Sequence, residues 1–312
     1  MHTIGPMGLR NLILFTRDSS LASIVNISQL AQSHQLNLFL RNPFEISIED
    51  SSFQALLEEQ NFEETIVLNR CSGITFDDHD LNLCDFLVDK GCFCPHRISS
   101  LRILRDKDQQ YLFLKKKDYP MVKTFIHRGL LTEEKLRNFD LTTEKKLESK
   151  LWIVKSIRGN KGIGILRLTT KELLSFWEKA VAQRDQRFLI QPFLGREPHS
   201  HEGAREIRIL NLGERNFAVE KEQGSNWKKN AQFSSFKEAS IKESERNHLF
   251  HLSDKIKEDL SLPHMAVDFI WNSLNQRWEI LEVNTHPGLE ASSEALGTSL
   301  YPLYWNSILP PT

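Results

Sequence analysis

Two apolar segments near the end of the chain constrain its fold more than any other feature. Residues 265–271 (MAVDFIW) and 277–284 (RWEILEVN) are apolar at most positions, whereas a strand with one face in water alternates apolar and polar residues. Residues 272–276 between them predict a hairpin turn. We therefore expect an antiparallel pair of strands in a sheet covered on both faces. The length of 312 residues allows roughly two or three domains.

Three polar side chains interrupt these strands, namely Asp268, Glu282 and Asn284. A turn centred on Asn275 makes positions 268 and 282 face each other, and alternation with a period of two puts all three side chains on one face. Two carboxylates this close repel each other and lose hydration, so a proton or a cation is expected between them. Because Mg²⁺ prefers oxygen ligands, we predict a metal site at these three residues. The alternative is a carboxylate pair at the sheet surface that faces solvent or a lysine.

The first hundred residues alternate strand and helix patterns, which predicts a small parallel sheet with crossover helices. Strands are expected at residues 11–16, 36–40 and 65–68, and helices at 19–33, 51–60 and 81–90. The rest of the chain lacks this regular alternation. There, strands are expected at 121–125, 151–157, 163–168, 188–192, 206–211 and 216–222, and helices at 108–117, 132–150, 171–183 and 243–260. We therefore expect an α/β front domain over residues 1–100, followed by an α+β part with a central unit over 101–190 and a C-terminal unit over 191–312.

A lysine within an apolar strand, followed by a glycine-rich turn, is the second unusual feature. Lys155 lies in the sequence LWIVKS, where a lone ammonium group is costly unless an anion pairs with it. Gly159, Gly162 and Gly164 follow, and glycines let backbone amide groups converge on a phosphate. The segment therefore predicts a phosphate site, and an ordinary hairpin is an equally simple interpretation.

The apolar strand FLIQPFLG, residues 188–195, is a candidate wall for an adenine base. Pro192 has no N–H, so its carbonyl would accept a hydrogen bond from the base edge while the N–H of Leu194 would donate one. Arg208 lies among apolar residues further on and needs a carboxylate or phosphate partner. A structural salt bridge to Glu206 or Glu220 is the alternative for this arginine.

Charge and cysteine content exclude several function classes. The net charge is 40 − 41 = −1, which argues against a bulk electrostatic grip on nucleic acid. No apolar stretch is long enough to cross a membrane and no secretory signal is recognised, so a cytoplasmic protein with reduced thiols is expected. Cys92, Cys94 and His96 alternate, but this spacing is unlike that of zinc sites, and we interpret the thiols as structural.

Taken in order, these motifs resemble the ATP-grasp superfamily. The matching segments are RDK (105–107), VKSIRGNKGIGI (154–165), QPFL (191–194) and EVNTHPGLE (282–290), and the resemblance extends over about residues 10–300. The RimK-type branch, the ribosomal-protein glutamate ligases, is the most similar. The resemblance implies an α/β front domain and two α+β subdomains with the nucleotide between the central and C-terminal subdomains.

The resemblance also implies roles for individual residues. Lys228 stands where that branch usually has arginine, and His199 and His201 lie in an added segment that is more simply a solvated loop. The implied catalytic residues are Arg208 and Lys228, the implied ATP contacts are Lys107, Lys155, Gly159, Gly162, Gly164, Gln191, Pro192, Phe193, Leu194, Glu197 and Asn230, and the implied ligands of Mg²⁺ (or Mn²⁺) are Asp268, Glu282 and Asn284.

A protein of this kind uses Mg²⁺ and ATP to join a carboxylate to an amine through an acyl phosphate. We expect an amino acid, plausibly glutamate, to be added to a peptide, protein or small acid. Neither nucleic acid nor membrane is an expected partner, and a homo-oligomer is compatible with the resemblance. The alternatives are a D-alanine or dipeptide ligase, and an ATP-binding regulator without catalysis.

Overall fold

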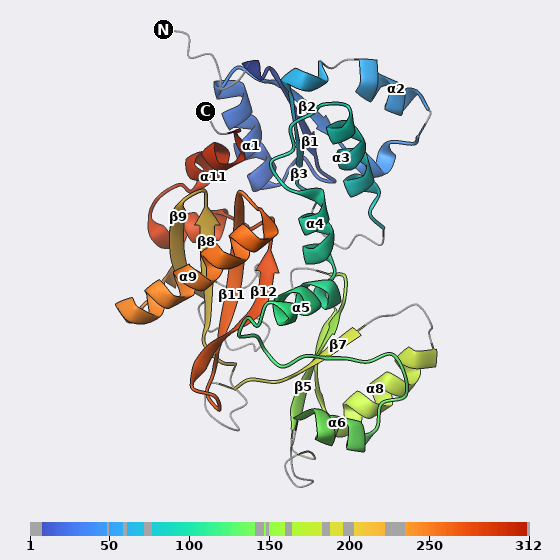
Figure 1. The fold of residues 1–312 in the computed structure, drawn as a ribbon, viewed down its shortest axis with the longest axis vertical. Coiled ribbons are helices and arrows are strands. Elements are labelled where there is room, and N and C mark those ends of the chain that lie inside the picture. The colour runs from blue at the N-terminus through green and yellow to red at the C-terminus, as the bar shows by residue number, and fades with distance from the viewer. Residues whose placement is uncertain are drawn as a thin grey trace.

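The computed structural model describes residues 8–48, 50–58, 61–71, 77–140, 147, 150–159, 164–182, 188–195, 203–221 and 235–310. These residues form three sheets, which Figure 1 shows with their covering helices. The expected division into a parallel α/β front part and an α+β remainder is confirmed. Within the described residues no helix is long and apolar enough to cross a membrane.

The front sheet is parallel, with strand order β2-β1-β3, as the alternation predicted. All five residues of β1 are buried, because helices cover both faces of this central strand. The elements are β1 (Asn11–Phe15), α1 (Ala22–Ser33), β2 (Asn37–Arg41), α2 (Ser51–Glu58), β3 (Thr65–Asn69) and α3 (His79–Asp89), with short 3₁₀ turns at Pro43–Glu45 and Phe62–Glu64.

The second sheet is antiparallel, with strand order β4-β7-β5-β6. Its elements are β4 (Phe125–Ile126), α6 (Glu133–Asp140), β5 (Leu151–Ser156), β6 (Ile165–Thr169), α8 (Thr170–Ala182) and β7 (Phe188–Pro192). The prediction of a strand at 121–125 is wrong, because the strand in this region, β4, begins only at Phe125. Val122 N donates to Ile280 O at 3.1 Å and Ile280 N donates to Pro120 O at 2.8 Å, so this segment follows the third sheet before β4 begins.

The third sheet is antiparallel, with strand order β10-β9-β8-β11-β12. Met265, Val267 and Phe269 pack with α9 on one face, while Ala266 belongs to a core shared with the front domain on the other. The two apolar segments are therefore buried on both faces, as expected. The elements are β8 (Glu206–Leu212), β9 (Arg215–Lys221), β10 (Phe236–Glu238), α9 (Glu243–Leu260), β11 (His264–Asn272), β12 (Arg277–Asn284), α10 (Glu290–Leu296) and α11 (Tyr301–Ile308).

Two helices link the front domain to the other sheets: α4 (Ile98–Arg105) and α5 (Lys107–Lys116). A buried glutamine fastens α5 to β12, because Gln110 Nε2 donates to Val283 O at 2.9 Å and Gln110 Oε1 accepts from Val283 N at 2.9 Å. Leu114 of α5 packs in the same core as α9. The orientation of α5, and with it the side chain of Lys107, is therefore set by the third sheet.

Replacing Gln110 with leucine is expected to lower the free energy of unfolding by roughly 2–4 kcal/mol, because both backbone groups of Val283 lose their buried partner. Urea-induced unfolding measures the change. Gln109→Leu is the matched control on the exposed face of α5, where we expect a change within about 0.5 kcal/mol. Equal effects of the two substitutions would contradict the role given to Gln110.

Candidate functional site

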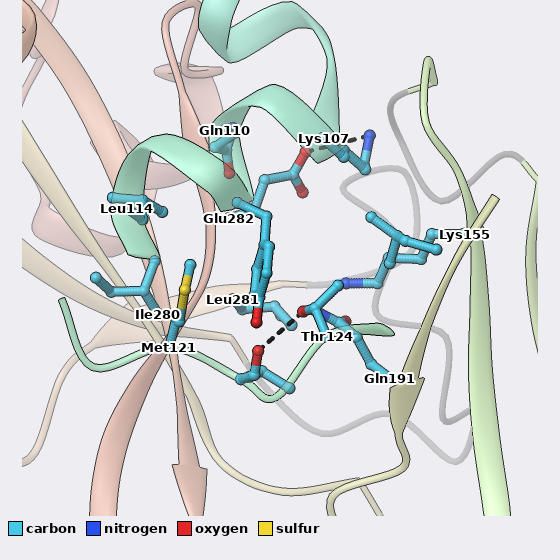
Figure 2. A pocket seen from close by; sticks show the side chains of 13 residues that line it. Lys107, Gln110, Leu114, Met121, Thr124, Lys155, Gln191, Ile280, Leu281 and Glu282 are labelled. Carbon is cyan, nitrogen blue, oxygen red and sulfur yellow. Dashed lines mark hydrogen bonds and ion pairs between the residues drawn. The ribbon is translucent and has the colours of Figure 1, made fainter. Parts of the chain in front are cut away.

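A pocket lies where the second sheet, α5 and β12 meet (Figure 2). It brings together four residues that the sequence had singled out: Lys107, Lys155, Gln191 and Glu282. The remaining lining is mostly apolar and comes from α5, the segment before β4, β7 and β12: Tyr111, Leu114, Met121, Val122, Leu189, Ile280 and Leu281, with Gln110 and Thr124 as polar exceptions. The pocket thus has a charged part and an apolar part.

Lys107 begins α5 and bridges two layers of the structure. Its Nζ donates to the carbonyl of Gly159, directly after β5, and lies 3.6 Å from Glu282 Oε1 on β12. Its backbone N donates to Ile157 O at 3.1 Å, which fixes the start of α5 against the end of β5. The ammonium group is therefore held over the gap between the two sheets.

Lys155 is buried in β5, and only 7% of its surface is exposed. Among the described residues its ammonium group has no hydrogen bond and no ion pair. Burial lowers the pKa of Lys155 to about 8, with Lys107 acting in the same direction and Glu282 against it. Near neutral pH the group is thus mostly charged without a close counterion, which suits the binding of an anion.

Gln191 lines the pocket, whereas residues 192–194 after it do not belong to the described lining. Gln191 Nε2 donates to Thr124 Oγ1 at 2.8 Å within the pocket, and Thr124 was not singled out from the sequence. Phe193 N donates to Leu151 O at 2.9 Å, and the Phe193 ring lies 5.2 Å from the guanidinium carbon of Arg167. Pro192, Phe193 and Leu194 are absent from the lining of this pocket as far as the described residues define it. Their predicted contact with a base edge stays a prediction.

The final hairpin has the expected register. Asp268 on β11 pairs with Glu282 on β12, a β-bulge follows between Asp268 and Phe269, and Asn284 pairs with Ala266. On the other side of β11, Asp268 pairs with Arg208 of β8. Three neighbouring strands, β8, β11 and β12, therefore contribute polar side chains to one face of the third sheet.

Asp268 is buried between two cations. Arg208 donates to it through Nε at 2.7 Å and Nη2 at 2.9 Å, and Lys221 Nζ lies 3.2 Å from Oδ2. Burial alone would raise the pKa of Asp268, but Arg208 and Lys221 outweigh it and hold this pKa well below its usual range. The carboxylate is thus ionised at all physiological pH values.

The alternative partners considered for Arg208 are wrong. Glu206 accepts from Lys221 at 2.9 Å, and Glu220 accepts from Arg205 at 2.9 Å. The sequence analysis missed Lys221, although it ends an apolar strand and is a buried cation like Lys155. A charged residue in an apolar strand is the pattern that identified Lys155, and the same pattern would have identified Lys221.

The three predicted metal ligands provide the oxygen atoms that a hard cation prefers. The Glu282 side chain is 30% exposed and reaches the pocket, and Asn284 Nδ2 lies 3.4 Å from Asp268 Oδ2. Asp268 would have to share its oxygens with Arg208 and Lys221, so the set fits Mg²⁺ with this one condition. Within the described ranges no group of three or more His, Cys, Asp and Glu side chains is placed to hold a metal, which includes the Cys92–His96 segment.

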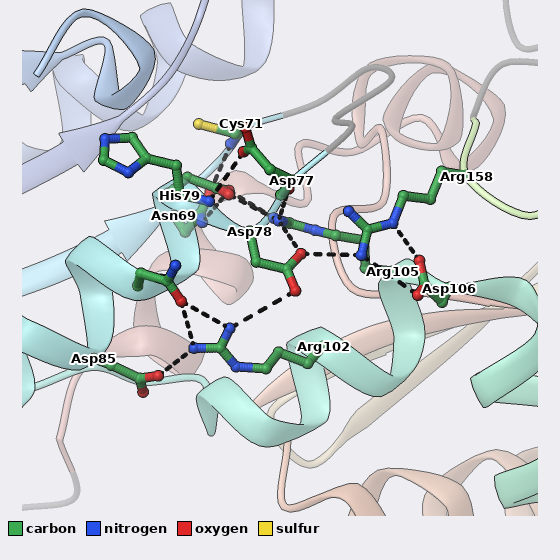
Figure 3. Close-up of polar contacts among 12 residues, drawn as sticks. Asn69, Cys71, Asp77, Asp78, His79, Asp85, Arg102, Arg105, Asp106 and Arg158 are labelled. Carbon is green, nitrogen blue, oxygen red and sulfur yellow. Dashed lines mark hydrogen bonds and ion pairs between the residues drawn. The ribbon is translucent and has the colours of Figure 1, made fainter. Parts of the chain in front are cut away.

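A chain of ion pairs joins the front domain to the residues after β5 (Figure 3). Arg158 pairs with Asp106, at the start of α5, and lies 3.3 Å from Asp78, at the start of α3. Asp78 also pairs with Arg105, which in turn binds the fully buried Asp80. The segment that leads into the glycine-rich turn is therefore fixed to the front domain.

The glycine-rich turn and the segment after β7 are described only at their ends. Gly164 has a φ of 74° and its Cα hydrogen faces Ser156 Cβ, so glycine is needed there. Gly159 is placed by its carbonyl, which accepts from Lys107. The other predicted contacts, Gly162, Glu197, Lys228 and Asn230, lie outside the described residues, as do His199 and His201.

The four thiols are free, and three are buried. Burial raises the pKa of Cys92 to about 12 and that of Cys94 to about 11, so both are protonated at neutral pH. Cys94 Sγ donates to His96 O at 3.2 Å. Because the thiolate is the reactive form, buried thiols with raised pKa values are weak nucleophiles at neutral pH.

No protein-family model and no curated protein sequence matches the chain. Solved structures do. N5-carboxyaminoimidazole synthetase from Staphylococcus aureus, complexed with ADP, has 12% sequence identity and a TM-score of 0.69 over 98% of this chain and 79% of that one. D-alanine–D-alanine ligase from Bacillus anthracis, complexed with ATP, has 14% identity and a TM-score of 0.66 over 96% of both chains.

A RimK domain protein of the ATP-grasp type from Sphaerobacter thermophilus has 15% identity and a TM-score of 0.65 over 96% of this chain and 100% of that one. Identities this low show the fold and leave the branch open. Three sheets of the expected kinds, with a pocket between the second sheet and the third, and these similarities over nearly the whole length give one conclusion: the chain has the ATP-grasp fold.

Proposed function

We propose that the protein is an ATP- and Mg²⁺-dependent ligase that joins a carboxylate to an amine, releasing ADP. The observation that carries the proposal is the pocket in which two lysines and Glu282 meet an apolar wall between the second and third sheets. A nucleoside triphosphate has the matching character, since its base is flat and largely apolar while its phosphates are anionic. The residue boundaries 100/101 and 190/191 for the three subdomains remain part of this proposal.

The apolar part of the pocket would hold the base and the charged part the phosphates. Leu114, Met121 and Ile280 form one apolar wall, and Gln191 with the following Pro192–Leu194 would meet the base edge. Lys155, which forms no ion pair with a described residue, and Lys107 would bind phosphate oxygens. Gly159, Gly162, Gly164, Glu197 and Asn230 are proposed nucleotide contacts on the sequence resemblance alone.

Glu282, Asp268 and Asn284 would hold Mg²⁺, which supplies charge neutralisation to the phosphate chain when bound. The residues of the chain are arranged for that role because Glu282 faces Lys107 in the pocket, where a phosphate could take over the lysine. Asp268 stays anchored by Arg208 and Lys221. Phosphoryl transfer depends mainly on such positioning and electrostatic stabilisation.

The chemistry proposed is transfer of the γ-phosphoryl group of ATP to an acid, which gives an acyl phosphate and ADP, followed by attack of an amine, which forms the amide and releases phosphate. Arg208, with Nη1 left over from its bidentate pair with Asp268, and Lys228 would stabilise the negative charge of the acyl phosphate and the tetrahedral intermediate. No nucleophilic side chain is needed, which agrees with the protonated, buried thiols. The amine substrate is proposed to be an amino acid such as glutamate, and the acceptor a peptide, protein or small acid.

A screen for ADP release tests the proposal. Amino acids are combined with peptides, small acids and cell extract in the presence of Mg²⁺ and ATP, and the product is identified by mass spectrometry. ADP release that needs both an acid and an amine supports the ligase. The similarity to a D-alanine–D-alanine ligase supports a second candidate, a dipeptide ligase, for which free amino acids alone would suffice. Saturable nucleotide binding with no ADP release in any combination would instead indicate a regulator.

Glu282→Gln is expected to reduce ADP release at least about a hundredfold, because the carboxylate that faces the phosphate lysines is lost. The fold should be retained, since the Glu282 side chain is 30% exposed. Glu258→Gln, on the exposed surface of α9, is the control with the same chemical change. Asp268→Asn is less informative because it removes the buried carboxylate that pairs with Arg208 while Lys221 keeps Glu206, and breaking a buried ion pair costs about 3–5 kcal/mol. Full activity of Glu282→Gln would reject the role proposed for this residue.

Nucleotide affinity is expected to fall as the pH rises through about 8, the pKa of Lys155 in the ligand-free protein. The lysine must be protonated to bind phosphate, so the Kd for Mg²⁺–ATP should rise about tenfold between pH 7 and pH 9. The free protein should change in the opposite sense and gain stability over the same range, because the unfolded chain holds this proton up to about 10.5.

Calorimetric titrations at several pH values measure the first effect. Lys155→Arg is the control, since a guanidinium keeps its charge throughout and should flatten the dependence. The same pH dependence in both proteins would show that another group is responsible.

A further inference from the structure

A second buried cation, far in the sequence from most of the pocket residues, has no counterion among the described residues. Arg70 directly follows β3, at the carboxyl end of the parallel front sheet, and 5% of its surface is exposed. Its Nε and Nη1 are buried without a hydrogen-bond partner, and within the described part of the chain it forms no ion pair. In open parallel sheets, ligands bind beyond the carboxyl ends of the strands.

The surroundings of Arg70 come from segments far apart in the sequence. Its guanidinium carbon lies 5.4 Å from the ring centroid of Tyr304 on α11. His96, which precedes α4, meets His264 of β11 with 3.0 Å between their Nε2 atoms, and its ring centroid is 5.7 Å from that of His286. His286 lies two residues beyond Asn284, so this cluster adjoins the end of β12.

Among the described residues no acidic side chain forms an ion pair with Arg70. The Glu290 carboxylate on α10 accepts from the Tyr301 hydroxyl, and the charge of Arg70 opposes the rise in the pKa of Tyr301 that burial and Glu290 cause. Within the described residues, His96 Nδ1, His286 Nδ1 and Tyr304 Oη are also buried without a hydrogen-bond partner, and Arg70 opposes the rise in the pKa of Tyr304 that burial causes. Burial, reinforced by the charge of Arg70, lowers the pKa of His96 to about 3, so this ring is neutral. Burial and the neighbouring His96 and Arg70 likewise lower the pKa of His264. One full positive charge is thus enclosed by polar atoms that lack partners.

An unpaired buried charge is costly, and proteins normally satisfy such groups with a counterion. The guanidinium is planar and presents parallel donors that match a carboxylate, and its single charge matches a monoanion better than a phosphate dianion. Three further unpartnered polar atoms around it are the arrangement expected of a site for a polar ligand.

We propose that Arg70 and the adjoining His96, His286 and Tyr304 form a binding site for a carboxylate group of one of the two substrates. That this carboxylate belongs to a substrate rests on the ligase function proposed above. The location agrees, because the segment that carries His286 continues directly from the proposed metal ligands on β12. Two sources share this chemistry: the α-carboxylate of the amino acid that is added, and a carboxylate of the acceptor.

The competing interpretation is that Arg70 only packs against the Tyr304 ring and stabilises the fold. The two interpretations differ in the ligand-free protein. If Arg70 is a ligand-binding cation, its unpaired buried charge destabilises the ligand-free protein. Arg70→Met removes this charge and keeps an unbranched side chain, so the melting temperature of the variant should equal or exceed that of the wild type. A structural cation predicts a clear fall. Arg97→Met, at an exposed arginine just before α4, is the control and should leave the melting temperature unchanged.

Binding is measured by calorimetry on the full chain with L-glutamate, its α-amide, glutarate and inorganic phosphate, each with and without Mg²⁺ and a non-hydrolysable ATP analogue. We expect a carboxylate probe to bind the wild type and the Arg97→Met control equally. It should bind Arg70→Met about 10- to 100-fold more weakly, as expected for the loss of a charged hydrogen bond. Arg70→Lys keeps the positive charge but loses the parallel N–H donors of the guanidinium, so its Kd for the carboxylate probe should lie between those of the wild type and Arg70→Met.

Binding of L-glutamate but not of its α-amide identifies the amino-acid carboxylate, whereas binding of glutarate identifies the acceptor. Preferential binding of phosphate, binding that is unchanged in Arg70→Met, or no carboxylate binding under any of these conditions would overturn the site. ADP release plays no part in this readout. If the ligase screen fails but carboxylate binding depends on Arg70, the ligase function is rejected and the binding site is kept. If the ligase screen succeeds but carboxylate binding does not depend on Arg70, the binding site is rejected and the ligase function is kept.

Discussion

The bidentate ion pair between Arg208 and Asp268 is the interaction on which the arrangement of the site depends. It joins β8 and β11 at paired register positions, on the face of the third sheet opposite the one that packs against α9. Lys221 binds both Asp268 and Glu206, so two cations and two carboxylates neutralise one another across three strands. Because the charges of these four side chains cancel, the net charge of the pocket is decided by the charged side chains that line it. Of the described residues that line the pocket, Lys107 and Lys155 are the cations and Glu282 is the anion, which gives this lining a net positive charge beside an apolar wall.

Much of this arrangement could be predicted from the sequence, because it rests on local patterns. The apolar strands of the final hairpin, interrupted by Asp268 and Glu282, gave the register that the structure has. The alternation in the first hundred residues gave the parallel front sheet. A lone lysine in β5 marked one wall of the pocket. Each of these inferences needs only the period of a strand and the cost of burying a charge.

What the sequence did not reveal depends on contacts between distant segments. Residues 121–122 look like a strand, but their hydrogen bonds go to Ile280, about 160 positions away. Arg208 was expected to need a carboxylate or phosphate partner, with Glu206 or Glu220 as the alternative, but the carboxylate that it binds is Asp268 on β11. Likewise, no local pattern placed His96, His264 and His286 around Arg70, because four separate segments meet there. Contacts between residues this far apart in the sequence depend on how complete helices and strands pack against one another.

The fastening of α5 to β12 through Gln110 has a mechanical consequence. Since α5 is bound to the third sheet and residues 120–122 follow β12 as well, a rigid swing of the second sheet would pivot just before β4. Lys107 would stay behind with the third sheet and Lys155 would travel with β5. Such a swing would have to break or stretch the contacts between the start of α5 and the end of β5, namely Lys107 Nζ to the Gly159 carbonyl, Lys107 N to Ile157 O, and Arg158 to Asp106. The separation of these two ammonium groups is therefore a gauge of how far the cleft stands open.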